Sequence, residues 1–110
     1  MRLTDEHCRP VNAADSPLSA ADAKALSGKV PLWTVSDGEI KRDFKFGDFR
    51  KAIGFVNELA DLCEAENHHP DIIISYNKVT LRLSTHRING LSRNDFILAA
   101  KIDMLSDASA

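Results

Sequence analysis

The chain has 110 residues, a formal net charge of −2, and 44% hydrophobic and 27% charged positions. That length and composition predict one domain with a small hydrophobic core. The charge balance provides no overall basic field for nucleic acid or anionic lipid. No stretch reaches the roughly 20 apolar residues that a membrane span needs, and the polar residues 1–8 lack the apolar centre of a secretory signal. We therefore expect a cytoplasmic protein without a membrane partner.

Composition shifts divide the chain into a terminal segment and a domain. Residues 1–15 mix charged and small residues around Pro10 without any periodicity, which is typical of a flexible N-terminal segment. Periodic apolar patterns begin after that point, so we expect a single domain over residues 16–106. Residues 106–110 are small and mostly polar, and we expect a loose end there.

The first half of the domain predicts a short helix and a hairpin. Ser19 has the character of a helix N-cap, with Asp22 three residues later, and predicts a helix over residues 20–26. A strand is expected over residues 31–35, and strict alternation over residues 40–46 predicts a second strand. The Asp37-Gly38 pair between them is typical of a tight hairpin turn.

The second half repeats this plan with a longer helix. Apolar residues recur at helical spacing over residues 49–66, and Pro70 prevents the helix from continuing. Strands are expected over 71–76 and 79–85, joined by an Asn77-Lys78 turn. Ser92 opens a final helix. The order α-ββ-α-ββ-α predicts an α+β, two-layer sandwich in which helices cover one face of a four-stranded antiparallel sheet.

The second hairpin predicts a cluster of histidines. With Asn77-Lys78 as the loop, antiparallel pairing turns the apolar residues of both strands toward the core. Extended past the strands, the same register brings His69 opposite His86. The residues expected to face the core are Ile72, Ile74, Tyr76, Val79, Leu81 and Leu83.

Neighbouring histidines suit proton transfer. Neutral imidazole accepts a proton and imidazolium donates one, with an unperturbed pKa of about 6.5, so His68, His69 and His86 can divide acid and base roles near neutral pH. This chemistry fits the elimination of water. The alternative for any one of them is a structural role, such as capping a helix or binding a backbone carbonyl.

A metal centre is a second interpretation of the same residues. Three histidines with Cys63 and Asp71 form a donor set that suits zinc. Against it, Cys63 falls on the apolar stripe of its helix, and the adjacent His68 and His69 would have difficulty directing both rings to one ion. The residues alone leave both interpretations open, and the family resemblance described next implies that neither a metal nor another cofactor is needed.

The spacing of these residues resembles the signature of the pterin-4a-carbinolamine dehydratases. That signature is an acidic residue, three residues, His-His-Pro, five residues, an aromatic, nine residues, His, and then Asp. The resemblance covers roughly residues 17 to 105, and its specificity lies in the number of positions that coincide. The matching residues are Glu64, His68, His69, Pro70, Tyr76, His86 and Asp95.

The resemblance implies dehydration of a 4a-hydroxytetrahydropterin to a quinonoid dihydropterin, which supports tetrahydropterin recycling for aromatic amino acid hydroxylases. It implies catalysis by His68, His69 and His86, with His68 and His86 as the proton-transfer pair and His69 orienting the substrate. Structural alternatives remain for three of the expected binding residues: a solvated helix end for Glu64, a cap for Asp95 and a core position for Trp33. The residues expected to bind substrate are Glu64, Pro70, Thr85, Arg87, Asp95 and Trp33.

Two positions depart from the family pattern. Asn67 stands where family members often carry Asp, and Asn94 stands where they often carry Arg, with Arg93 one place early. Both changes remove charge near the expected site, which puts substrate preference and rate in doubt.

The family also offers a non-enzymatic alternative, an oligomeric scaffold or transcriptional coactivator that uses a helical surface. This alternative predicts that the apolar face of the helix over residues 49–66 stays exposed for a protein partner, or for self-association as a dimer or tetramer. A basic cluster over residues 41–51 alternates with apolar residues, which is typical of a solvated strand face, so no direct nucleic-acid contact is expected. The candidate contact residues on the helix are Phe49, Ile53, Val56 and Cys63.

Overall fold

The computed structural model describes residues 2–105 and Ala108. The expected domain boundary at residue 106 and most of the expected loose C-terminal end lie outside the described residues. The helices are α1 (Ala20–Ser27), α2 (Phe49–Glu66) and α3 (Arg93–Asp103), with two short 3-10 helices, η1 (Leu3–Asp5) and η2 (His86–Ile88). The strands are β1 (Thr34–Ser36), β2 (Glu39–Lys45), β3 (Asp71–Ser75) and β4 (Lys78–Leu83).

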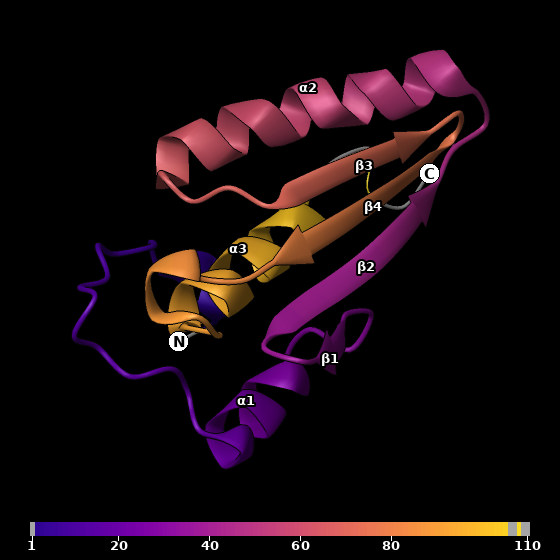
Figure 1. The fold of residues 1–110 in the computed structure, drawn as a ribbon. Helices are drawn as coiled ribbons and strands as arrows, with labels where there is room; N and C mark the ends of the chain where they lie inside the picture. Colours follow the sequence, from indigo (N-terminus) through magenta and orange to yellow (C-terminus); the bar gives the residue numbers. More distant parts are fainter. Residues whose placement is uncertain (1, 106–107, 109–110) are drawn as a thin grey trace.

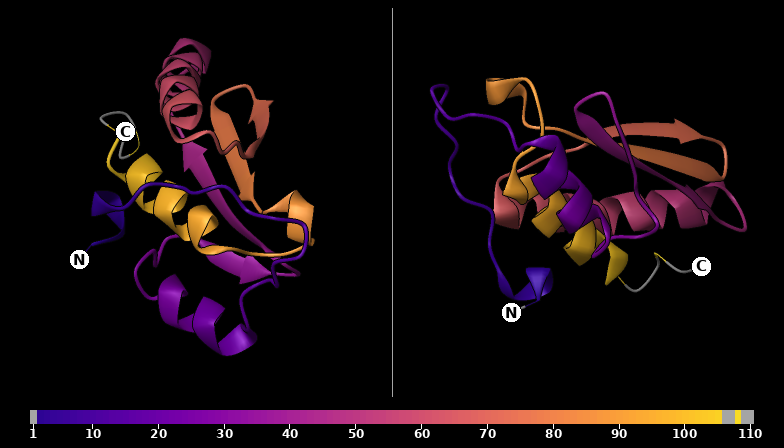
Figure 2. Two further views of the ribbon diagram at one scale, coloured as in Figure 1. Left: turned by 90° about the vertical axis from the view of Figure 1, so that its left-hand side faces the viewer. Right: turned by 90° about the horizontal axis from the view of Figure 1, so that it is seen from below.

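The four strands form one antiparallel sheet in the order β1-β2-β4-β3. The helices α2 and α3 lie on one face of this sheet, and α1 lies next to β1 (Figures 1 and 2). The predicted α+β two-layer architecture is therefore confirmed. Within the described residues, no helix combines the length and the apolar character that a membrane span requires.

Local signals in the sequence set the helix ends. The side chains of Ser19 and Asp48 each accept a backbone N–H from the first turn of the helix that follows. Ser92 and Asp95 form a reciprocal capping box at the start of α3. At the end of α2, Asn67 adopts a left-handed conformation with φ 52°, which asparagine tolerates better than most residues. Asn67 therefore turns the chain sharply just before the histidine pair.

Aromatic residues from β2 and α2 form the centre of the core. The ring of Phe55 lies 4.7 Å from that of Phe44 and 5.2 Å from that of Phe46, measured between centroids. All three side chains are buried, and burial of each contributes about 1.5–3 kcal/mol. The alternation of β2 and the helical stripe of α2 thus meet in one apolar layer, which packs α2 against the sheet.

The first strand is shorter than predicted. The strand was expected over residues 31–35, but β1 spans only Thr34–Ser36. The backbone N–H of Trp33 donates to the carbonyl of Val30 at 3.0 Å, so the preceding residues form a turn around Pro31. The predicted turn at Asp37-Gly38 is confirmed by positive φ values at both residues.

The predicted register of the second hairpin is wrong. Its turn is Tyr76-Asn77 instead of Asn77-Lys78, so Ile72 pairs with Leu81 and the register differs by two residues from the expected one. The cause is β2, because Phe46 and Asn77 are joined by two hydrogen bonds, Phe46 N–H to Asn77 O at 2.8 Å and Asn77 Nδ2 to Phe46 O at 2.9 Å. Lys78 is thereby drawn into β4.

Burial of the second hairpin also differs from expectation on one strand. A shift of two residues preserves the faces of a strand, and Val79, Leu81 and Leu83 of β4 are fully buried as predicted. On β3, however, Ile72 and Ile74 are each 39% exposed, and Tyr76 in the turn is 67% exposed. The reason is that β3 is an edge strand of the sheet, and the helices pack mainly against its neighbour β4.

The N-terminal segment, for which we expected flexibility, lies along α3 (Figure 2, left). Leu3 in η1 is only 3% exposed and belongs to the core. The carboxylate of Glu6 accepts two hydrogen bonds from the guanidinium of Arg93, both at 2.7 Å. These contacts bring the residues that follow Glu6 to the end of α2.

Candidate active site

One cavity of about 530 Å³ lies where four segments of the chain converge. These segments are the end of α2, the end of β4 with η2, the start of α3 and the N-terminal residues 8–12. The side chains of His68, His69 and His86 all line this cavity, and Thr85 and Arg87 line it with them. The three histidines therefore lie together, as the sequence predicts, although the register from which we inferred their proximity is shifted.

His68 is bonded to a fully buried carboxylate. Its Nε2 lies 2.6 Å from Oδ1 of Asp95, which has no exposed surface. The other oxygen of Asp95 accepts the hydroxyl of Thr85 and the backbone N–H of Ser92, both at 2.9 Å. Since an ionised carboxylate only accepts hydrogen bonds, Asp95 places the proton of a neutral His68 on Nε2 and leaves Nδ1 as the basic nitrogen.

His69 has a different and more exposed partner. Its Nε2 lies 2.6 Å from Oε2 of Glu64, and the two side chains are 54% and 78% exposed. Such an exposed pair contributes little to stability, about 0–1 kcal/mol, but it orients the ring.

His86 and Arg87 reach the cavity from the short helix η2. The loop that carries them is closed by the backbone N–H of Thr85, which donates to the carbonyl of Gly90 at 2.8 Å. Asn89 makes the return turn possible by adopting φ 52°. Both His86 and Arg87 are exposed, so they lie on the solvent side of the cavity.

Not every residue of the expected set lines the cavity. Of the described residues in that set, Glu64, Pro70, Asp95 and Trp33 are absent from the lining. Asp95 contacts the lining residues His68 and Thr85 from behind. The prediction that Trp33 binds substrate is wrong. Trp33 is 4% exposed, and its indole N–H donates to the carboxylate of Asp103. A tryptophan in this position belongs to the core and cannot stack on a ligand in the cavity.

Cys63 is in the core as its place on the apolar stripe predicts. It is 2% exposed, and burial raises the pKa of its thiol to about 11. In the described part of the chain, no group of three or more histidine, cysteine or acidic side chains is arranged to hold a metal ion.

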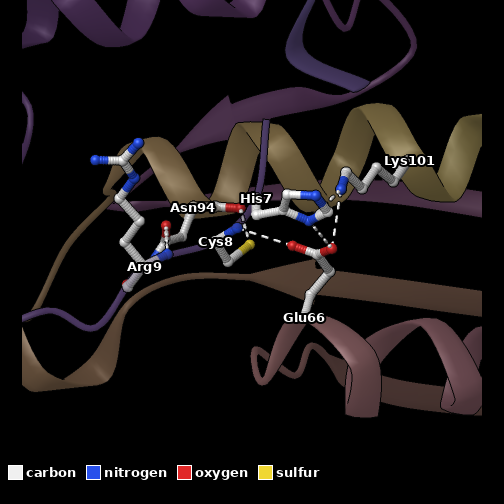
Figure 3. A network of polar contacts seen from close by, with 6 residues as sticks. All are labelled: His7, Cys8, Arg9, Glu66, Asn94 and Lys101. Atoms are coloured by element: carbon white, nitrogen blue, oxygen red, sulfur yellow. Dashed lines mark hydrogen bonds and ion pairs between the residues drawn. The ribbon is translucent and has the colours of Figure 1, made fainter. Parts of the chain in front are cut away.

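Sequence reasoning missed the buried carboxylate of Glu66, which is 8% exposed. Its Oε1 accepts the backbone N–H of Cys8 at 2.8 Å, and its Oε2 lies 2.9 Å from both Lys101 Nζ and His7 Nδ1 (Figure 3). Burial alone would raise the pKa of Glu66, but these hydrogen bonds outweigh it and lower the pKa to about 2. A glutamate at the end of a helix gives no sign of this in the sequence.

Asn94 was noticed only as a departure from the family pattern. In the structure it is 8% exposed, and its side chain brackets the backbone of Arg9 (Figure 3). Its Oδ1 accepts the Arg9 N–H at 2.9 Å, and its Nδ2 donates to the Arg9 carbonyl at 2.6 Å. Asn94 and Glu66 together therefore hold the N-terminal segment at the edge of the cavity.

Comparison with known proteins identifies the family of the chain. The sequence model of the pterin 4 alpha carbinolamine dehydratases matches residues 16–105. This chain belongs to that family. The dehydratase-family relatives include proteins from Methylococcus capsulatus, 43% identical over 94% of this chain and 93% of its own length, and from Halorhodospira halophila, 43% identical over 96% and 98%. Both are provisionally named pterin-4-alpha-carbinolamine dehydratase.

Solved structures of dehydratase-like proteins share the fold. The crystal structure of a transcriptional coactivator/pterin dehydratase from Brucella melitensis superposes with a TM-score of 0.77 at 32% identity, over 84% of this chain and 99% of that one. A pterin dehydratase-like protein described as a RuBisCO assembly factor of the alpha-carboxysome superposes with a TM-score of 0.54 at 22% identity, over 64% and 82% of the two chains. The second similarity concerns the fold alone.

Proposed function

We propose that this protein catalyses the dehydration of a 4a-hydroxytetrahydropterin. The bond between C4a and the hydroxyl oxygen breaks, N5 loses its proton, and a double bond forms between C4a and N5, so the products are a quinonoid dihydropterin and water. The reaction moves protons without net oxidation, so an acid and a base suffice. The observation that carries the proposal is the meeting of His68, His69 and His86 at one cavity, with a buried carboxylate behind His68.

In this proposal His68 is the base that removes the N5 proton. The Nε2–H of His68 donates to Oδ1 of Asp95, with 2.6 Å between the nitrogen and the oxygen, so the free lone pair is on Nδ1. When Nδ1 takes a proton, the ring becomes positive, and the buried negative charge of Asp95 stabilises it. Because Thr85 and Ser92 fix the carboxylate, the imidazole is oriented before substrate arrives.

His86 is the proposed acid that protonates the departing hydroxyl. It lies on the exposed side of the cavity in η2, where water can return its proton after each turnover. His69, oriented by Glu64, and the neighbouring Thr85 and Arg87 would position the substrate.

The quinonoid product is a form that a reductase can return to tetrahydropterin, so we place the reaction in tetrahydropterin recycling for aromatic amino acid hydroxylases. The cytoplasmic location stays a prediction.

The test is an assay in which 4a-hydroxytetrahydropterin is generated in situ and quinonoid product is followed by ultraviolet absorbance. Wild type should accelerate the reaction, and His68→Ala and His86→Ala should lose most of that acceleration while keeping the wild-type circular dichroism. Added imidazole should restore part of the activity to His68→Ala, which a folding defect would not allow. A parallel run contains a chelator, and we expect no change. Folded wild type that accelerates none of a range of pterins would refute the proposal.

A second candidate function, self-association or protein binding, rests on apolar side chains that the single chain leaves exposed. In the edge strand β3 and the turn after it, Ile73 is 47% and Tyr76 67% exposed, and Phe49 at the start of α2 is 50% exposed. Unpaired edge strands with apolar side chains favour association. Cys63, which the scaffold alternative placed on such an exposed helical face, is buried, so the candidate surface is restricted to β3 and the first turns of α2.

We propose a homo-oligomer formed through this surface. Light scattering after size-exclusion chromatography should give a dimer or tetramer for wild type and a smaller species for Ile73→Lys. A strictly monomeric wild type at high concentration would contradict the proposal and would leave the dehydratase assay unaffected.

A further inference from the structure

We propose that residues 8–12 form a strap that supplies the apolar wall of the ligand site, and that Asn94 is the positioning residue that fixes the strap. The inference rests on the proposed function, because it concerns how the same cavity recognises a pterin. All five residues of the strap line the cavity of about 530 Å³. None of them belongs to a helix or a strand, so neither type of element holds the strap in position.

The strap is held by side chains from two elements of the domain. Glu66 at the end of α2 accepts the N–H of Cys8, and Asn94 at the start of α3 accepts the N–H of Arg9 and donates to its carbonyl (Figure 3). Both residues are 8% exposed, so these hydrogen bonds are partly shielded from water. Both hydrogen bonds of the Asn94 side chain go to the backbone of Arg9, and the side chain of Arg9 points away from Glu66 (Figure 3), so Asn94 holds the backbone of Arg9 and not its charge.

The composition of the cavity shows what the strap offers to a ligand. The lining contributed by the domain is polar or charged throughout, from Glu66 and the histidines to Arg87. Among the described lining residues, Pro10 and Val11 of the strap are the aliphatic ones. Sites for small molecules combine apolar surface with a few placed polar groups, and a flat pterin ring has two faces to cover. The strap therefore provides ring contact, while the histidines provide the chemistry.

This division of labour predicts how Asn94 influences the reaction. Contact with the faces of the ring is the same before and during proton transfer, so it lowers KM without changing kcat. Asn94→Ala removes both hydrogen bonds to Arg9, so the part of the strap that carries Pro10 and Val11 loses its anchor while Cys8 stays bound to Glu66. We expect the dissociation constant for 6-methyl-7,8-dihydropterin and the KM to rise about tenfold, with kcat changed by less than about twofold.

The experiment measures the amide exchange of the strap and the binding of the ligand separately. Amide hydrogen exchange at Arg9, read without ligand, should be faster in Asn94→Ala than in wild type. Isothermal titration with 6-methyl-7,8-dihydropterin gives the dissociation constant, and the dehydration assay gives KM and kcat. The matched control is Asn57→Ala, an exposed asparagine of α2, which should leave all three measurements at wild-type values.

Two further variants act on the wall itself and leave Asn94 intact. Pro10→Gly and Val11→Ala should raise the same dissociation constant, so the inference stays testable if Asn94→Ala folds poorly. Faster exchange at Arg9 with unchanged dihydropterin binding would overturn the inference, because the strap would then not contact the ligand. A fall in kcat at constant KM would also overturn it, because Asn94 would then act through its neighbour Asp95.

The outcome for the strap can be distinguished from that for the proposed function. If wild type binds 6-methyl-7,8-dihydropterin but does not accelerate dehydration, the proposed function fails and the binding and exchange measurements still decide the role of the strap.

Discussion

Two glutamates at the end of α2 show how differently the two halves of the site are built. Glu64 belongs to the histidine motif, yet its side chain is 78% exposed and its single described partner is His69. Glu66, two residues later and outside the motif, is buried and joins α3 to the N-terminal segment through Lys101 and Cys8. In the proposed function the exposed motif residues face the substrate, whereas the buried carboxylate of Glu66 holds segments of the site together. A sequence pattern reports the first property and gives little sign of the second.

The largest effect is expected at the centre of the motif. His68→Ala should lower kcat by roughly 10²- to 10⁴-fold, because it removes the proposed base, and the loss should be nearly absent from KM. Stopped-flow measurement of quinonoid product gives both constants. A variant with near wild-type kcat would show that His68 has a structural role. The motif and the buried residues outside it would then not differ in function.

Glu66→Gln tests the region outside the motif through stability and pH. The pKa of Glu66 is lowered to about 2 from 4.5, so its contribution is present above pH 4.5 and is lost as the pH falls toward 2. At pH 7 this difference corresponds to about 3 kcal/mol of unfolding free energy, and the variant should lose up to that amount.

Urea unfolding at several pH values measures this directly. Wild type should lose stability between pH 4.5 and pH 2 more steeply than Glu66→Gln, and the two curves should converge at the acidic end. Parallel curves that keep a constant separation down to pH 2 would show that the carboxylate charge is not what Glu66 contributes.

Asp95→Asn sharpens the comparison because Asp95 belongs to both regions, as a motif residue that is also fully buried. Asparagine keeps the size of the side chain and one acceptor oxygen, but it loses the charge that would stabilise a protonated His68. We expect kcat to fall roughly 10- to 100-fold and the unfolding free energy to fall by about 1 kcal/mol through the weaker cap. Chemical denaturation together with the kinetic assay separates these effects, and a loss of stability without a change in kcat would assign Asp95 to the cap alone.

Much of the fold was predictable because its signals are local. The caps at Ser19, Asp48 and Ser92 and the apolar stripe of α2 each act within a few residues, and the helices begin where these signals place them. The turn of the second hairpin was not predictable in this way. Asn77 is held by Phe46 of another hairpin, and a contact between residues so far apart in the chain leaves no periodic trace.

The residues of the site also differ in how far the sequence predicts them. The motif pointed to His68, His69 and His86, which line one cavity although the register used to argue their proximity was shifted. Tyr76 of the same motif does not line that cavity. The partners Glu66 and Asn94 were missed because each binds backbone groups of the N-terminal segment. Any residue has those backbone groups, so the sequence of that segment carries no matching signature.

The smallest effect is expected at Glu64, even though it belongs to the motif. Glu64→Gln should lower kcat/KM by less than about fivefold and change the unfolding free energy by at most about 1 kcal/mol, because exposed ion pairs are screened by water. The assay should be run at low and high salt, since the effect on kcat/KM should shrink as salt screens the pair with His69. A loss as large as that of His68→Ala would mean that the carboxylate touches substrate directly. Exposure in the unliganded chain would then be a poor guide to which motif residues act, and the contrast with Glu66 would rest on stability alone.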